Sequence, residues 1–263
     1  MPLLEALNLR KTFSGRCVVD DASFTVDRGE IVGLLGRNGA GKTTSFRMVI
    51  GMIQPDPKHG KVNFINRDVS RLAMYQRARL GMGYLSQEPS IFRRLSVEQN
   101  LLAILQTRKA GKAWRQNRLE ELLDRFDLAK TRRQPARTLS GGERRKLEIA
   151  RALVTEPKMI LLDEPFSGVD PRTVESLQDE IRALRDDHDI AILITDHNVH
   201  QTLRVCDRAY IIDQGRIFAE GTPSEIINDE NVKRVYLGSL FRGDEFDDHR
   251  NEKITDKSAA GVS

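Results

Sequence analysis

A glycine-rich segment carries the strongest chemical pattern in the sequence. Residues 36–43, Gly-Arg-Asn-Gly-Ala-Gly-Lys-Thr, fit the spacing G-x-x-x-x-G-K-[ST] after an apolar run. Glycines let backbone N–H groups crowd around phosphate oxygens, and the N-terminus of a following helix adds partial positive charge. We expect Lys42 to reach the β- and γ-phosphates of ATP and Thr43 to bind Mg²⁺. The predicted nucleotide-binding residues of this P-loop are Gly36, Asn38, Gly39, Ala40, Gly41, Lys42, Thr43 and Thr44.

Two adjacent carboxylates follow the apolar run 159–162. Asp163 is expected at the end of a strand, where it can hold Mg²⁺ through water. Glu164 is the next residue and points the other way along a strand, so that it can polarise the water that attacks the γ-phosphate. Acidic pairs at strand ends are common, and this pair gains its meaning from the P-loop. Together the two motifs predict ATP hydrolysis.

A second glycine-rich segment, Leu-Ser-Gly-Gly-Glu at residues 139–143, precedes a helical pattern. Ser140, Gly141 and Gly142 ahead of a helix are typical of an anion site, and equally of an ordinary helix N-cap. One chain does not need two phosphate cradles for one ATP. The segment by itself therefore leaves both interpretations open.

Short β-rich apolar runs alternate with helical patterns, which predicts an α/β fold with a largely parallel sheet. We expect strands at residues 3–9, 31–35, 62–65, 82–85, 159–162, 190–194 and 210–212. We expect helices at residues 42–50, 114–126, 142–154, 173–185 and 199–205. Residues 89–155 show no convincing strand and are predicted to form an inserted helical subdomain. The predicted domain covers residues 1–240, and residues 241–263 are predicted to form a disordered tail.

The composition, with 39% hydrophobic and 30% charged residues, suits a soluble globular protein. The net charge is +4, but 42 basic and 38 acidic residues are mixed along the chain, so we expect no nucleic-acid partner. The apolar runs are too short to cross a bilayer and the N-terminus lacks a signal-peptide pattern, which predicts a cytoplasmic protein without direct membrane insertion. Cys17 and Cys206 have no metal or disulfide spacing.

The P-loop, the Leu-Ser-Gly-Gly-Glu segment and Leu-Leu-Asp-Glu-Pro at residues 161–165, in this order, resemble the ATPase subunits of ABC transporters. The resemblance covers residues 3–243. It implies a P-loop NTPase of ABC type, with a RecA-like core, an antiparallel β part and an inserted helical subdomain. It also implies a head-to-tail dimer of two copies, in which each ATP lies between one P-loop and the partner's Ser140 and Gly142.

Further positions match this family one by one. Gln87 resembles the glutamine that contacts Mg²⁺ and the attacking water, and His197 resembles the histidine that contacts the γ-phosphate. Asp170 resembles the aspartate of the D-loop. Phe13 stands where the family places an aromatic ring against adenine, and the alternative is a core phenylalanine. Arg37 departs from the usual Pro or Ser, which a cradle of backbone N–H groups tolerates.

Four stretches, at residues 90–97, 164–171, 194–199 and 232–238, resemble the ATPase subunits of lipopolysaccharide exporters. The closest alternative is the ATPase subunit of branched-chain amino-acid importers, which usually has Glu-His-Asp around the histidine where this chain has Asp196-His197-Asn198. The resemblance implies two transmembrane permease subunits at the cytoplasmic face of the inner membrane. We expect them to dock near residues 89–95, from Pro89 to Leu95, where Ile91, Phe92 and Leu95 stand beside Arg93 and Arg94. The alternative is that Phe92 is buried in its own subdomain.

Two other function classes are weighed against transport. A soluble ABC-type ATPase that acts on DNA or the ribosome usually has coiled-coil insertions or tandem ATPase domains, and neither is visible here. A nucleotide-binding regulator without turnover would not need Glu164 and His197. Both classes are therefore disfavoured.

Overall fold

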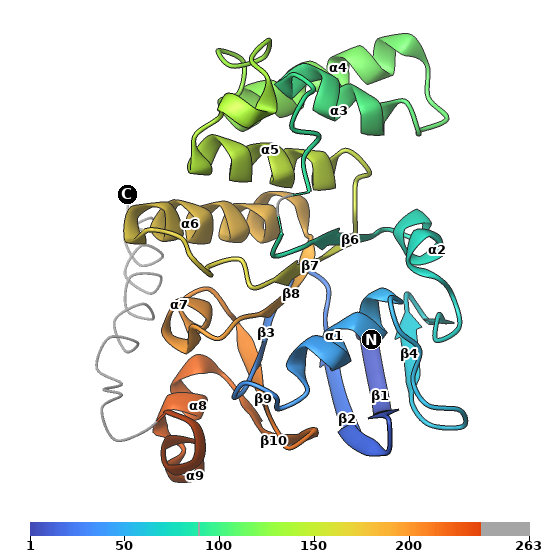
Figure 1. The fold of residues 1–263 in the computed structure, drawn as a ribbon, viewed down its shortest axis with the longest axis vertical. Coiled ribbons are helices and arrows are strands. Elements are labelled where there is room, and N and C mark those ends of the chain that lie inside the picture. Colours follow the sequence, from blue (N-terminus) through green and yellow to red (C-terminus); the bar gives the residue numbers. More distant parts are fainter. Residues whose placement is uncertain (89, 238–263) are drawn as a thin grey trace, which may run out of the picture.

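The structure is a computed structural model that describes residues 1–88 and 90–237. Pro89 and the predicted tail at residues 241–263 lie outside the described residues. Figure 1 shows an α/β arrangement in which one group of helices lies apart from the strands of the amino-terminal region. None of the helices in the described ranges combines the length and the apolarity that a bilayer crossing requires.

A six-stranded sheet in the order β10-β9-β3-β8-β7-β6 forms the centre of the fold. Five of its strands are parallel, and β10 (Arg216–Gly221) pairs antiparallel with β9 (Arg208–Asp213). The strands β3 (Ile31–Leu35), β7 (Met159–Asp163) and β8 (Ala191–Thr195) are buried at every position, and β6 (Met82–Leu85) completes the sheet. Parallel strands covered on both faces read as continuous apolar runs, which is why the sequence reveals them.

A second, antiparallel sheet has the order β2-β1-β4-β5. Its strands are β1 (Leu4–Phe13), β2 (Arg16–Val26), β4 (Lys61–Phe64) and β5 (Arg67–Asp68). Apolar side chains of β1, β2 and β4 join those of β3 and of helix α1 (Lys42–Ile50) in one core cluster. This cluster fixes the P-loop, which lies between β3 and α1, against the antiparallel sheet.

The helical group between β6 and β7 contains α3 (Val97–Leu105), α4 (Lys112–Arg125), the short η1 (Ala136–Thr138) and α5 (Gly141–Leu153). Figure 1 shows these helices gathered at the top of the molecule, with α6 (Pro171–His188) between α5 and the sheet. Their buried side chains form one core with those of β7 and β8. The predicted fold class, with an antiparallel part and an inserted helical part, is confirmed.

Several elements have no counterpart among the predicted ones. The sequence analysis gave no bounds for β2, β5, β10, α2 (Met74–Arg79), α3 or α8 (Pro223–Asn228). The remaining short elements are α7 (Val199–Leu203), α9 (Glu230–Val232) and η2 (Lys233–Leu237). β10 reads Arg-Ile-Phe-Ala-Glu-Gly and buries no residue fully, so its polar alternation gives a weak strand signal.

A fully buried arginine, Arg77, caps the C-terminal end of α1. The Arg77 guanidinium donates to the carbonyls of Met48 at 2.8 Å and of Val49, both in the last turn of α1, and to those of Leu72 and Ser70 at 3.0 Å. A cation at a helix C-terminus satisfies carbonyls that lack helical partners and is favoured by the helix dipole. Burial lowers the pKa of Arg77 to about 10. Arg77 therefore anchors the helix that begins at Lys42.

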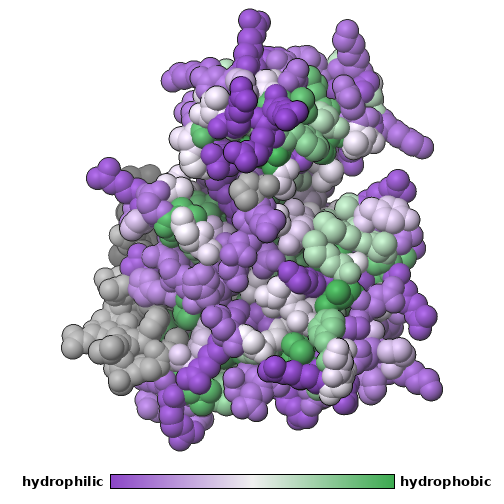
Figure 2. Space-filling model, in the orientation of Figure 1, coloured by the Kyte–Doolittle hydropathy of each residue, from purple (hydrophilic) through white to green (hydrophobic). Residues whose placement is uncertain are grey.

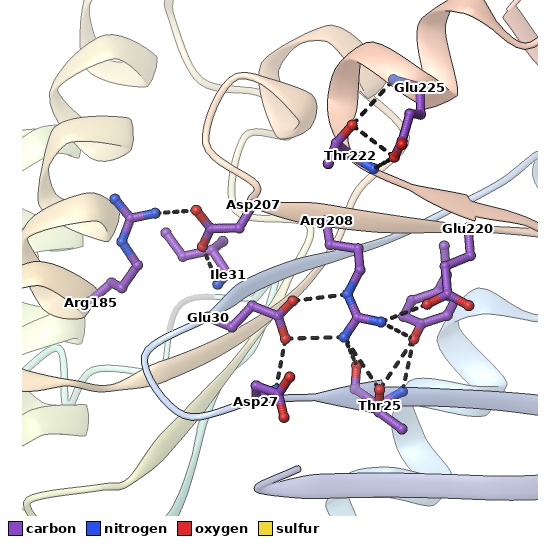
Figure 3. Close-up of polar contacts among 11 residues, drawn as sticks. Thr25, Asp27, Glu30, Ile31, Arg185, Asp207, Arg208, Glu220, Thr222 and Glu225 are labelled. Carbon is purple, nitrogen blue, oxygen red and sulfur yellow. Dashed lines mark hydrogen bonds and ion pairs between the residues drawn. The ribbon is translucent and has the colours of Figure 1, made fainter. Parts of the chain in front are cut away.

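Arg208, at the start of β9, connects the two sheets. Its guanidinium donates to both carboxylate oxygens of Glu30 at 2.9 and 3.2 Å, to Glu220 of β10 at 2.6 Å and to the Thr25 carbonyl of β2 at 3.3 Å. Figure 3 shows this side chain reaching between the three partners. Glu30 immediately precedes β3, so the network fixes the end of β3 opposite the P-loop.

Replacing Arg208 with Met is expected to lower the free energy of unfolding by about 2–3 kcal/mol, because charge-assisted hydrogen bonds to half-buried partners are lost. The matched control is Arg216→Met, which removes an ion pair with Asp20 from a side chain that is 66% exposed and should leave the unfolding midpoint unchanged, because exposed ion pairs contribute little. Urea unfolding followed by circular dichroism measures both. Equal midpoints for the two variants would contradict the role of Arg208.

Candidate functional site

The P-loop lies at the carboxyl end of β3 and runs into α1. Gly39 and Gly41 have positive φ values of 81° and 107°, a region that L-residues rarely enter. A Cβ on Gly36 would lie 2.2 Å from the Ile212 carbonyl oxygen, and a Cβ on Gly41 would lie 2.8 Å from the Val18 oxygen. The loop therefore lies so close to its neighbouring strands that only glycine fits at positions 36 and 41.

Lys42 is buried, although it carries a charge. Its Nζ donates to the carbonyl oxygens of Gly36 at 2.5 Å and of Arg37 at 3.0 Å. Burial lowers the pKa of Lys42, while the negative charges of Glu164 and Asp196 act in the opposite direction. The ammonium thus lies inside the loop and is bonded to the loop's own carbonyl oxygens, which suits a group that binds phosphate.

The predicted acidic pair lies at the carboxyl end of β7. Asp163 is 7% exposed and accepts a hydrogen bond from the Tyr84 hydroxyl at 3.2 Å. Burial raises the pKa of Asp163, and the nearby Glu164 adds to this effect. Glu164 has a positive φ of 47°, and its N–H donates to the Thr195 carbonyl at 2.7 Å. This conformation turns Glu164 out of the strand and toward β8.

The side chains of Gln87 and His197 both approach the carboxylate of Glu164, so that three predicted residues lie together. The Gln87 amide nitrogen donates to Glu164 Oε2 at 2.9 Å, and His197 Nδ1 lies 3.6 Å from the same oxygen. Gln87 follows β6 and His197 follows β8, the strands on either side of β7. Because carboxyl ends of neighbouring parallel strands meet at one edge, the three residues are brought together from far apart in the sequence.

The sequence analysis did not identify Asp196 as a site residue. Its side chain is fully buried and accepts from the backbone N–H groups of Phe166 and Asn198, both at 2.9 Å. Its Oδ1 also lies 3.4 Å from His197 Nδ1. Asp196 thereby fixes the turn after β7 to the turn after β8. An aspartate directly between a buried strand and His197 is the signal that could have revealed it.

The predicted Mg²⁺ ligands have the chemistry that this ion prefers. Thr43 offers a hydroxyl, Asp163 a carboxylate and Gln87 an amide oxygen, and Mg²⁺ takes oxygen ligands while retaining several waters. Thr43 follows Lys42 in the first turn of α1, and both Asp163 and Gln87 lie at the carboxyl edge of the central sheet. The residues present therefore fit the ion.

The Leu-Ser-Gly-Gly-Glu segment forms the start of α5. Ser140 is the N-cap of α5. Its Oγ accepts a hydrogen bond from the Glu143 N–H, and the Glu143 carboxylate accepts one from the Ser140 N–H. A Cβ on Gly141 or Gly142 would meet nothing within 4 Å. Every hydrogen bond of the Ser140 side chain within the described residues goes to Glu143. In a single chain this segment is thus exposed. None of these hydrogen bonds connects it to the P-loop of the same chain.

Asp170 is the N-cap of α6, where its carboxylate accepts from the Thr173 N–H at 3.1 Å and the Thr173 hydroxyl at 2.6 Å. These bonds lower the pKa of Asp170. In the described part of the chain this carboxylate has a local capping role, and its assignment to nucleotide binding as the D-loop aspartate stays a prediction.

Phe13 ends β1 and is 45% exposed, so it is not a core residue. Lys11 Nζ lies 5.6 Å from the centre of its ring. A pocket of about 610 Å³ lies beside the P-loop and is lined by Arg37, Asn38, Gly39, Ala40 and also by Arg16, Cys17 and Val18 of β2. The ring is available for stacking near this pocket, since β1 and β2 meet at the pair Phe13 and Arg16.

Phe13→Ala is expected to raise the Michaelis constant for ATP by about tenfold with little change in maximal rate, because base–aromatic stacking is worth on the order of 1–3 kcal/mol. The matched control is Tyr75→Ala, which removes an exposed ring from α2. Steady-state phosphate release over a range of ATP concentrations measures both. An unchanged constant would remove Phe13 from the nucleotide site.

Comparisons with known proteins agree with this geometry. A family model described as ABC transporter matches residues 19–167, and one described as Branched-chain amino acid ATP-binding cassette transporter matches residues 216–241. The chain is 55% identical over 243 residues to the lipopolysaccharide export system ATP-binding protein LptB of Escherichia coli strain K12, covering 92% of this chain and 100% of that protein. It is 52% identical over 243 residues to LptB of Haemophilus influenzae, with the same coverage.

A solved structure of similar fold is the ADP conformation of MJ1267, an ATP-binding cassette of an ABC transporter. It superposes with a TM-score of 0.80 at 27% identity and covers 90% of this chain and 99% of that one. The ABC transporter model matches more than half of the chain, and the similarity to LptB extends along the whole of that protein. The chain therefore belongs to the ABC transporter family, among its ATP-binding proteins.

Proposed function

We propose that this chain is the ATP-hydrolysing subunit of a lipopolysaccharide export transporter. The observation that supports hydrolysis most directly is the meeting of Gln87 and His197 at Glu164, whose charge acts on the buried Lys42. The similarity to E. coli LptB over that protein's full length supports the transported substrate.

Each residue then has a role in the reaction. The P-loop amides and Lys42 hold the phosphates, and Phe13 stacks on adenine. Glu164 orients the attacking water and accepts its proton, while Gln87 and His197 hold Glu164 and the γ-phosphate in place. Thr43, Asp163 and Gln87 would hold Mg²⁺, which would neutralise charge on the phosphates.

The alternative substrate class is a branched-chain amino acid, and one observation favours it. The family model at residues 216–241 is described by that class of transporter. However, that match covers only residues 216–241 and includes neither the P-loop nor Glu164 and His197. The similarity along 92% of this chain supports the exporter instead.

The working unit in this proposal is a dimer of two copies. Ser140, Gly141 and Gly142 stand open at the start of α5, where the helix N-terminus favours an anion. In a head-to-tail pair these residues serve the ATP held by the other copy. Asp170, which also lies at a helix start, would face the partner in the same arrangement.

We further propose that two permease subunits dock beside Phe92, at the cytoplasmic face of the inner membrane. Phe92 is 45% exposed, which contradicts the alternative that it is buried in the core. The Arg151 guanidinium lies 4.7 Å from the centre of its ring, and Arg93 and Arg94 follow it on the surface. Ile91, expected to share this surface, is instead buried in the helical core.

Two more exposed apolar side chains are those of Met52, which follows α1, and of Tyr75 in α2. Tyr75 is 61% exposed and Met52 is 44% exposed. Figure 2 shows hydrophobic side chains gathered on the side of the molecule where α2 lies, with smaller hydrophobic groups elsewhere on a largely hydrophilic face. Exposed aromatic rings bordered by arginines are typical of the centre of a protein interface.

Phe92→Ala is expected to leave the subunit folded and able to hydrolyse ATP, but to abolish its co-purification with the permeases. The ring is half-exposed, so its loss costs little core packing. Phe218→Ala, which truncates a ring of 41% exposure on β10, is the matched control and should bind normally. Normal recovery of the permeases with Phe92→Ala would refute the docking site.

The transport proposal is tested with the full chain and its permeases in proteoliposomes that contain lipopolysaccharide. We expect ATP and Mg²⁺ to release lipopolysaccharide to an acceptor protein, and no release without the chain. If no lipopolysaccharide is released and leucine is taken up in an ATP-dependent manner, the chain belongs to the importer class instead.

A further inference from the structure

The last described element reaches the first residue of the P-loop. The Gly36 N–H donates a hydrogen bond to the Tyr236 hydroxyl at 2.9 Å, across 200 residues of sequence. Tyr236 lies in η2 (Lys233–Leu237), which follows α8 and α9. The roles proposed above for the nucleotide site do not use this tyrosine.

The Tyr236 ring is held in place by an apolar cluster. It packs against buried residues that come from the end of β3, from α7, β9, α8 and α9, namely Leu35, Leu203, Ala209, Ile211, Ile226, Ile227 and Val232. Burial raises the pKa of Tyr236 to about 12, and the negative charge of Asp196 adds to this effect. The hydroxyl therefore keeps its proton at neutral pH and lies against the first residue of the P-loop.

Gly36 is constrained from three sides. Tyr236 accepts from its N–H, Lys42 donates to its carbonyl oxygen at 2.5 Å, and the Ile212 carbonyl leaves no room for a side chain. The peptide plane at Gly36 sets the direction in which the rest of the loop leaves β3. A contact that fixes this plane therefore also fixes the phosphate-binding N–H groups that follow.

We propose that Tyr236 is a positioning residue of the nucleotide site, and that residues 222–237 act as a brace for the P-loop. This inference rests on the proposed function, because it assigns Tyr236 to the binding of the ATP that the chain hydrolyses. The brace acts through Gly36 and does not touch the nucleotide. It couples the carboxyl-terminal segment of the chain to the affinity for ATP.

The test is Tyr236→Phe, which removes the hydroxyl and keeps the ring in its apolar cluster. The dissociation constant for Mg·ATP, measured by titration with a fluorescent ATP analogue, is expected to rise about three- to tenfold, the usual effect of losing one neutral hydrogen bond. The Michaelis constant should rise in parallel, with the maximal rate changed by less than about twofold.

Two control variants separate positioning from general loosening. Tyr210→Phe removes the hydroxyl of another packed ring, one that bonds Thr25 and not the P-loop, and should change neither constant. Val235→Ala shortens the neighbouring side chain of η2, which is half-buried, without touching the hydroxyl. If Val235→Ala weakens ATP binding as much as Tyr236→Phe, the effect is one of packing and the inference is wrong.

The outcomes also distinguish this inference from the proposed function. Wild-type protein that binds ATP without hydrolysing it would refute the hydrolytic function, while the binding titration would still test Tyr236. Wild-type protein that hydrolyses ATP, with Tyr236→Phe binding it equally well, would refute the brace alone.

Discussion

Glu164→Gln is expected to retain ATP binding and to lower the turnover rate by a factor on the order of 10²–10⁴, the usual contribution of a positioned general base. The Gln side chain keeps the shape of Glu and can still accept from the Gln87 amide, now 2.9 Å from the carboxylate. It cannot accept a proton from water. The variant should therefore accumulate in an ATP-bound dimer, which size-exclusion chromatography with Mg·ATP detects.

The matched control for this prediction is Glu156→Gln. Glu156 is exposed and pairs with Arg108 at 3.1 Å, so the loss of its charge should leave turnover unchanged. Phosphate release is measured for both variants at saturating ATP. A rate for Glu164→Gln within about twofold of wild type would remove Glu164 from the catalytic role.

Lys42→Ala and Ser140→Arg are each expected to abolish hydrolysis, and a mixture of the two is expected to recover part of it. In a head-to-tail dimer, a heterodimer of these variants has one site in which Lys42 and Ser140 are both intact. Random mixing makes half of the dimers heterodimers, so independent sites would restore up to about a quarter of the wild-type rate.

A second mixture gives this experiment its control. Lys42 and Glu164 act on the same ATP from the same chain, because the Glu164 charge acts on the Lys42 ammonium. A heterodimer of Lys42→Ala with Glu164→Gln thus has no intact site and should stay inactive. If neither mixture recovers because the two sites must work together, Ser140→Cys in a chain that also carries Cys17→Ser, treated with a thiol-reactive ATP analogue, decides the question. Crosslinking only to nucleotide on the same chain would overturn the shared site.

The sequence predicts the parts of the site whose residues form a motif with a known chemical role. The P-loop, Asp163 and Glu164 follow apolar strands that are buried on both faces, so both the element and the motif are readable. Gln87 and His197 follow β6 and β8 in the same way. Their meeting at Glu164 follows from the strand order, in which β7 lies between β8 and β6.

The residues that sequence analysis missed act through distant partners. Tyr236 and Gly36 are 200 residues apart, and Arg208 and Glu30 are 178 residues apart. No local pattern marks such a pair. Arg77 is harder still, because a charged residue predicts exposure, and its burial depends on carbonyls freed at the end of α1. Burial of charge is decided by tertiary packing, which a single sequence does not display.

The two cysteines differ in a way that makes the unaltered chain convenient for spectroscopy. Cys17 is exposed and lines the pocket beside the P-loop, whereas Cys206 is buried and burial raises the pKa of its thiol. Thiolate is the form that reacts with alkylating dyes, so a maleimide fluorophore attaches selectively at Cys17. The natural sequence thus already carries a labelling site next to the nucleotide pocket. Opening and closing of this region can be followed as a change in the fluorescence emission of the attached dye, without any engineered cysteine.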